Sequence, residues 1–156
     1  MEMMRKPGEE HRKLHALAGS FQGEEKMYPS PWDPKGGSAM GKIESRVDFD
    51  GFFVVSDYIQ ERAGQVTYRG HGVYGYNESE RGYLMHWFDS MGDAAVAPAR
   101  GRWEGKTLTF EQTTPTGPSR YVYTFVAEGR YRFTIEHSQD GKQWTPFMEG
   151  SYARSR

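Results

Sequence analysis

The sequence predicts an all-β fold, a closed antiparallel up-and-down barrel of about ten strands with a short N-terminal capping helix. From Ser20 onward, apolar and polar residues alternate with a period of two, and turns of two to four residues separate the segments. The segments cover about 60% of the chain, more than an ordinary domain contains. Consecutive strands joined by short turns run antiparallel beside one another, and closure removes the two free edges of the sheet. We therefore expect residues 1–156 to form one barrel domain.

The chain begins with a helical pattern. Glu9 and Glu10 stand where a first turn favours carboxylates, and Leu14 and Leu17 follow at helical spacing. Gly19 comes directly after this pattern and ends it. The spacing predicts a helix over residues 9–18 that covers one end of the barrel.

The strand pattern is clearest in residues 41–49, where Ile43, Val47 and Phe49 share one face and charged residues occupy the other. Asp50 and Gly51 then form a turn. The predicted strands are 20–28, 39–49, 52–62, 65–76, 83–90, 94–103, 107–114, 119–127, 130–138 and 144–154. Eight strands enclose space for side chains or one small ligand. Ten strands therefore predict room inside.

Composition excludes several functions. Twenty basic residues against 21 acidic ones give a formal charge of −1, which removes the attraction that nucleic acids and anionic membranes require. Zero cysteines exclude disulfides, cysteine-ligated metals and thiol nucleophiles. No apolar run reaches the ~18 residues of a membrane span, and the start is polar. We expect a cytoplasmic protein with no membrane partner, no nucleic-acid partner, no metal and no cofactor.

Several blocks of the chain resemble one protein family. They are residues 10–21, 51–58, 72–77, 83–91 and 148–154, and the fourth contains the run Trp-Phe-Asp-Ser-Met. Together they resemble an uncharacterised bacterial family of calycin-like, or lipocalin-like, barrels of unknown function. The resemblance covers nearly the whole chain. It implies a lipocalin-like barrel and attaches no biochemical activity.

A more distant resemblance is to nitrobindin-type haem-binding barrels. In those proteins a Pro-His-Leu-Glu stretch of the last strand carries the histidine that binds iron, whereas here the stretch reads Pro-Phe-Met-Glu with Phe147 at the histidine position. Phenylalanine cannot coordinate iron, which disfavours haem binding unless another histidine substitutes. The resemblance implies that Phe147 faces the cavity, as does Asp89, which shares a strand face with Trp87.

Two further motifs have simpler interpretations. Gly70, Gly72 and Gly75 fit G-x-G-x-x-G, but they lie inside a strand pattern instead of opening a helix, so a dinucleotide site is disfavoured. His11 and His15 have the spacing of two metal ligands on a helix. No third ligand accompanies them, and we expect surface or cap positions.

The favoured function is non-catalytic binding of a small, mostly apolar or aromatic molecule inside the barrel. Asp89, if it points into an aromatic cavity, needs a partner or a ligand, because a buried carboxylate is costly. His86 falls on the strand face opposite to Trp87 and Asp89. On a regular strand His86 and Asp89 therefore cannot both point inward. The predicted ligand-binding residues are Phe53, Tyr58, His86, Trp87, Asp89, Trp103, Phe110 and Phe147.

Three alternatives stay open beside ligand binding. The first is an isomerase or hydrolase that uses Asp89 or a strand histidine as an acid or base; no residue is assigned as catalytic. The second is the haem-binding barrel. The third is an interaction module that acts as a homodimer through an exposed strand face.

Overall fold

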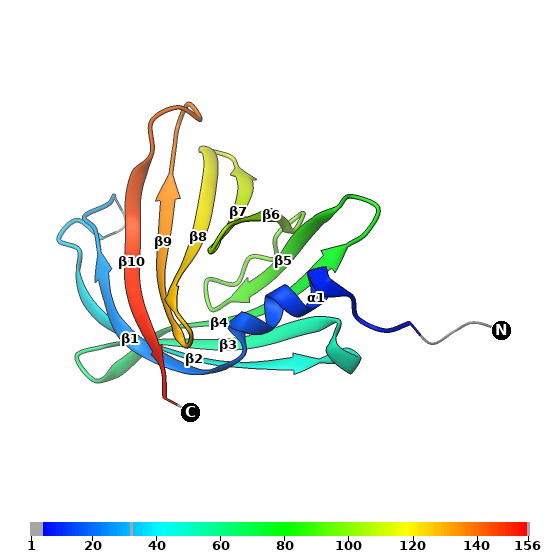
Figure 1. The fold of residues 1–156 in the computed structure, drawn as a ribbon. Helices are drawn as coiled ribbons and strands as arrows, with labels where there is room; N and C mark the ends of the chain where they lie inside the picture. The colour runs from blue at the N-terminus through cyan, green and yellow to red at the C-terminus, as the bar shows by residue number, and fades with distance from the viewer. Residues whose placement is uncertain (1–4, 32, 156) are drawn as a thin grey trace.

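The barrel prediction is confirmed by a computed structural model, which describes residues 5–31 and 33–155 (Figure 1). Ten antiparallel strands close into one barrel in which each strand pairs with its sequence neighbours and β1 pairs with β10. The strands are β1 (Gly19–Met27), β2 (Gly37–Asp48), β3 (Phe53–Arg62), β4 (Gln65–Asn77), β5 (Gly82–Asp89), β6 (Ala99–Glu104), β7 (Thr107–Thr114), β8 (Gly117–Ala127), β9 (Arg130–His137) and β10 (Thr145–Arg154).

The helical segment is short and changes type. Helix α1 (Glu9–Lys13) continues as the 3-10 helix η1 (Leu14–Leu17), and Gly19, with φ of 131°, starts β1. Leu14 and Leu17 are buried in the core, which fixes the segment against the barrel. In Figure 1 it lies across one end of the strands. The predicted capping helix is therefore present, as one α-helical turn followed by a tighter one.

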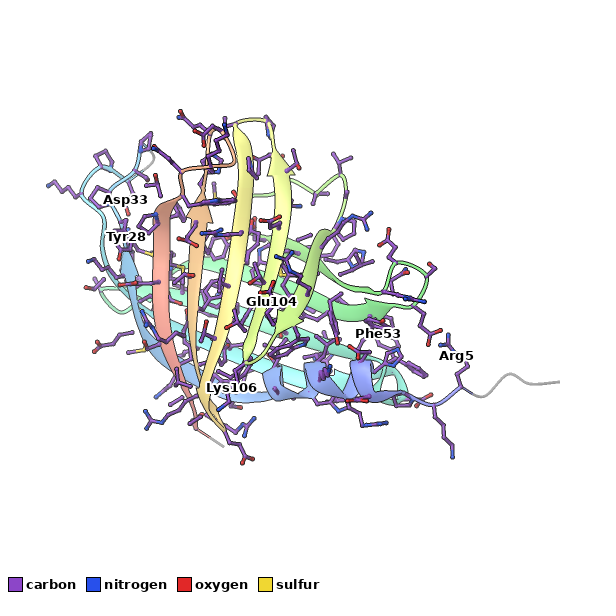
Figure 2. All side chains as sticks on the ribbon, turned by 45° about the horizontal axis from the view of Figure 1, so that its top comes forward. Arg5, Tyr28, Asp33, Phe53, Glu104 and Lys106 are labelled. Atoms are coloured by element: carbon purple, nitrogen blue, oxygen red, sulfur yellow. The ribbon has the colours of Figure 1, made fainter. Side chains whose placement is uncertain are left out.

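The up-and-down order gives the barrel two different ends. The turns after β2, β4, β6 and β8 lie at the helical end, together with the start of β1 and the end of β10. The connections after β1, β3, β5, β7 and β9 lie at the opposite end. Figure 2 shows Lys106 near the helical end and Tyr28 and Asp33 at the other. We call the barrel interior near the helix the capped half and the rest the open half.

The core fills the capped half and the middle of the barrel. Phe110, Leu108 and Val54 have 0% of their surface exposed, and Phe21 has 2%. Burial of these side chains supplies stabilisation at roughly 25 cal/mol per Å² of apolar surface. Trp103 and Phe125, whose ring centroids lie 5.7 Å apart, are half-buried against this core.

Two details of the strand predictions were wrong. A strand was expected from residue 94, but β6 begins at Ala99, because Pro98 cannot donate a backbone hydrogen bond to a ladder. The apolar face of β2 was expected to be dry throughout. Ile43 is buried, but Val47 is 40% exposed. Phe49 is 62% exposed, and it lies beyond the strand in the short 3-10 helix η2 (Phe49–Gly51).

Within residues 5–31 and 33–155, none of the helices combines the length and the apolar character that a bilayer crossing demands. The same residues contain no group of three or more potential His, Cys, Asp or Glu metal ligands.

Candidate functional site

The open half holds a polar cluster around Glu25. This residue of β1 is 2% exposed. It lies four positions after the core residue Phe21, on the same face of the strand, and therefore points into the barrel. The hydroxyl of Tyr58 donates to both carboxylate oxygens at 2.7 and 2.8 Å, and Gln60 Nε2 donates to Oε1 at 2.9 Å. The Tyr152 hydroxyl donates to Oε2. Three neutral groups therefore hold this carboxylate, and the single Tyr58 hydroxyl proton is shared between its two oxygens.

A second cluster surrounds Asp89 at the end of β5. Its Oδ2 accepts hydrogen bonds from the Tyr68 hydroxyl at 2.6 Å and from the Trp87 indole Nε1 at 3.1 Å. Its Oδ1 accepts from the backbone N–H of Met91 at 3.0 Å. Trp87 Nε1 also lies 3.0 Å from the Tyr68 hydroxyl. In contrast to Glu25, Asp89 is only half-buried.

Aromatic rings connect the two clusters. The ring centroid of Tyr58 lies 5.8 Å from that of Tyr68 and 6.3 Å from that of Trp87. Tyr121, on β8, is close enough to Asp89 that the carboxylate charge influences its hydroxyl. All four rings are half-buried. The open half thus presents a set of ring surfaces beside a reachable carboxylate.

The tyrosines of this half are held in their protonated form. Burial raises the pKa of Tyr58, and the negative charge of Glu25 raises it further. Burial likewise raises the pKa of Tyr152, Tyr68 and Tyr121, and the nearby carboxylates add to the effect. These hydroxyls therefore remain neutral donors across the physiological pH range.

Two glycines of the G-x-G-x-x-G run create the position of Trp87. A Cβ atom on Gly70 would lie 2.1 Å from the indole Cζ2, and one on Gly72 would lie 2.9 Å from Cε3. Both glycines face the interior directly across from β5, since Gly72 pairs with Trp87 and Gly70 with Asp89. Gly75 instead accommodates the ring of Phe53. The run is a packing device that lets large rings lie flat on a strand.

Three of the predicted ligand-binding residues come together in the open half: Tyr58, Trp87 and Asp89. Phe110 and Trp103 also point inward but belong to the core nearer the capped end. Phe110 is fully buried, and the Nε1 atom of Trp103 is buried without a hydrogen-bond partner. Only a rearrangement of the core would expose Phe110 to a ligand.

Two predicted residues lie on the outer face. Phe53 is 38% exposed and packs on Phe49, with ring centroids 5.6 Å apart. His86 is exposed, on the face of β5 opposite to Trp87 and Asp89. Neither lines the interior. Of the two faces of β5, the one that carries Trp87 and Asp89 therefore points inward, and the one that carries His86 points outward.

Phe147 stands at an irregularity of β10. The register against β9 shifts between Pro146 and Met148, so the residue between them interrupts the alternation. Met148 is 5% exposed and lies on the same inward face of β10 as Tyr152, whereas Phe147 is half-buried. The bulge explains why the strand pattern did not reveal which of the two faces inward.

The haem alternative requires a histidine that reaches the interior. His137 is on the inward parity of β9, opposite Ser119. Its Nδ1 lies 3.0 Å from the Ser119 hydroxyl, and its Nε2 lies 3.3 Å from that of Thr116. His11 is buried at the helical end, with Nδ1 accepting from the Gly8 N–H at 2.9 Å. Both histidines already serve the protein's own contacts.

Sequence reasoning missed five members of the site: Glu25, Gln60, Tyr68, Tyr121 and Tyr152. One signal was available. Glu25 shares its parity with Phe21 and Met27, so an acid stood on the apolar face of the first strand. The others could not be singled out, because the chain has ten tyrosines and the strand pattern does not show which of them meet across the barrel.

A groove of about 890 Å³ runs along β1, β2 and β10, and Glu25 is among the residues that line it. Its lining mixes opposite charges, with Lys26, Lys35 and Arg132 beside Glu61 and Glu149. Unlike the open half, this groove presents no aromatic side chain among the residues that line it.

Comparison with known proteins identifies the family. A family model described as a protein of unknown function (DUF1579) matches residues 6–154. The chain belongs to this family. The DUF1579 match spans the whole barrel together with its helix, so the family description applies to the complete fold.

Among solved structures, the DUF1579 chain is similar to the crystal structure of Rv2717c from M. tuberculosis. The two have a TM-score of 0.71 and 12% sequence identity over 96% of this chain and 99% of that one. At this identity the likeness shows the fold alone. A search of the curated proteins matched none.

Proposed function

We propose that this DUF1579 protein is a calycin-like carrier that binds a small, mostly apolar or aromatic molecule in the open half of its barrel. The observation that supports the proposal is the partial exposure of the inward rings of Tyr58, Tyr68 and Trp87. Leu108 and Phe110, which also face inward, are fully buried. Solvent therefore reaches the rings of the open half, and a ligand that displaces this water gains roughly 25 cal/mol per Å².

Polar groups in the same region would orient the occupant. Ligand sites combine apolar walls with a few fixed donors and acceptors, and the Tyr58–Glu25 and Tyr68–Asp89 pairs supply both kinds. Binding is favoured over catalysis because both oxygens of Asp89 already accept hydrogen bonds from the protein. The proposal places the protein in the cytoplasm.

Fluorescence titration with N-phenylnaphthylamine, a neutral aromatic probe, tests this function. We expect a saturable increase in probe emission with one-to-one stoichiometry, confirmed as a mass adduct by native mass spectrometry. Trp87→Ala removes a ring of the site and is expected to weaken binding about tenfold, equivalent to ~1.4 kcal/mol. Phe88→Ala, on the exposed face of the same strand, is the matched control and should leave affinity unchanged.

Two results would overturn the proposal. One is an absence of saturable binding by the folded protein. The other is equal weakening by Trp87→Ala and Phe88→Ala, which would place the probe on the outer face. The same mass spectra report a doubled mass if the chain is a homodimer, the interaction-module alternative.

A further inference from the structure

We propose that the natural occupant of the open half is a small organic cation with a substituted ammonium group. The ammonium would be held between the carboxylate of Asp89 and the rings of Trp87 and Tyr68. The inference rests on the proposed function, since it names the chemical class of the molecule that the barrel binds. Charge, ring arrangement and access support it.

The first argument is uncompensated negative charge. Nine ion pairs join the described residues, and neither Glu25 nor Asp89 belongs to any of them. Arg62, at the rim of the open half, is paired with Asp33 at 2.8 Å. The contacts of Glu25 and Asp89 come from hydroxyl, amide and indole groups, which donate hydrogen bonds but carry no charge.

Neutral donors lower the cost of burying a carboxylate without cancelling its charge. Two carboxylates in a partly dry interior therefore create a negative potential that a ligand cation can neutralise. A neutral ligand gains nothing from this potential, and an anion is repelled by it. The charge of the site thus selects among the aromatic and apolar molecules that the rings alone would accept.

The second argument is the arrangement of the rings. Tyr58, Tyr68, Trp87 and Tyr121 contribute four aromatic side chains from β3, β4, β5 and β8. The face of an aromatic ring attracts cations, most strongly in tryptophan, and substituted ammonium ions are typically bound by such sets of rings. Because Trp87 lies flat against Gly70 and Gly72, one face of its indole covers β4. The other face is directed away from that strand, toward the interior.

The third argument separates the two carboxylates by access. Glu25 is 2% exposed, so it contributes charge without offering a contact. Asp89 is half-buried and lies where β5 has already left its ladder with β6, which ends at the Met85–Ala99 pair. We therefore assign the direct contact with the ammonium group to Asp89.

The test compares two probes that differ by one atom: meta-hydroxyphenyl trimethylammonium and its neutral isostere meta-tert-butylphenol. Binding is followed by NMR through the Trp87 indole N–H signal, which is identified among the four tryptophans by its loss in Trp87→Phe. We expect the cation to bind about tenfold more tightly than the neutral probe. High salt should reduce this preference.

Asp89→Asn supplies the matched variant. It is expected to remove most of the preference for the cation while leaving the affinity for meta-tert-butylphenol unchanged. Asp57→Asn is the control, since Asp57 lies on the outer face of β3 and pairs with His71 at 2.7 Å. The comparison of the two probes on the unchanged protein needs no variant, so it decides the question even if Asp89→Asn fails to fold.

The outcomes separate this inference from the proposed function. Equal affinity for the two probes at Trp87 overturns the cation inference and leaves small-molecule binding intact. A preference that survives in Asp89→Asn overturns the assignment of Asp89. If neither probe shifts the Trp87 signal, the cation inference fails, and the N-phenylnaphthylamine titration decides the proposed function separately.

Discussion

The two halves of the barrel interior are built from the same strands but have different chemistry. Strand β1 gives Phe21 to the capped half and Glu25 to the open half, and β5 gives Met85 to the core and Asp89 to the open half. In β1 and β5 the change from apolar to polar occurs without a break in the alternation. Stability and ligand chemistry are thus separated along the barrel axis. The open half can carry a buried carboxylate because the capped half supplies the apolar core.

The largest effect is expected in the capped half. Leu108→Ala removes a side chain with no exposed surface and leaves a cavity, so the free energy of unfolding should fall by about 2–5 kcal/mol. Urea denaturation followed by circular dichroism measures the loss. Glu111→Ala, at an exposed position of the same strand, is the control and should change stability little. A loss below about 1 kcal/mol would show that Leu108 is not part of a tight core.

A smaller effect is expected for Glu25→Leu in the open half. The substitution leaves the donors of Tyr58, Gln60 and Tyr152 without their acceptor, so unfolding should become easier by about 1–3 kcal/mol. Glu25→Gln keeps an acceptor oxygen and should cost less. If Glu25→Leu stabilises the protein, burial of the charge costs more than its hydrogen bonds return, which would contradict a structural role for the carboxylate.

The smallest effect is a pH dependence in the capped half. Burial lowers the pKa of His11 below its ordinary value of 6.5, so the unfolded chain takes up a proton at a higher pH than the folded one. Stability should therefore decrease as pH falls below 6.5 and stop decreasing below the folded pKa. Urea midpoints across this range measure the slope. His11→Asn should flatten it; equal slopes in the two proteins would contradict the burial effect.

The sequence predicted the closed barrel because alternation and turn chemistry act locally, and both are visible in residues such as Ile43 and Gly64. It could not place Phe53. The turn before this residue contains Phe49 and Asp50 with φ of 51° and 58°, and such a turn decides which face the following strand presents. Tyr58 was predicted together with Phe53, although the five-residue separation sets them on opposite faces of a regular strand.

The candidate site was predicted only in part, for a related reason. Trp87 and Asp89 could be paired by parity along one strand. Their contact with Tyr68, and the position of Trp87 beside the Tyr58 ring that binds Glu25, depend on register and curvature. The role of Gly70 under the indole could not be read from its spacing either. It requires knowing which side chain lies opposite.

The ladder between β5 and β6 has three residue pairs, whereas the ladder between β3 and β4 has ten. Separating β5 from β6 breaks fewer backbone hydrogen bonds than separating any other pair of neighbouring strands. Thermal motion should therefore open the sheet most easily there, beside Asp89. The barrel wall is therefore most easily deformed beside Asp89. A ligand too large for the open half could be accommodated there by separation of β5 from β6.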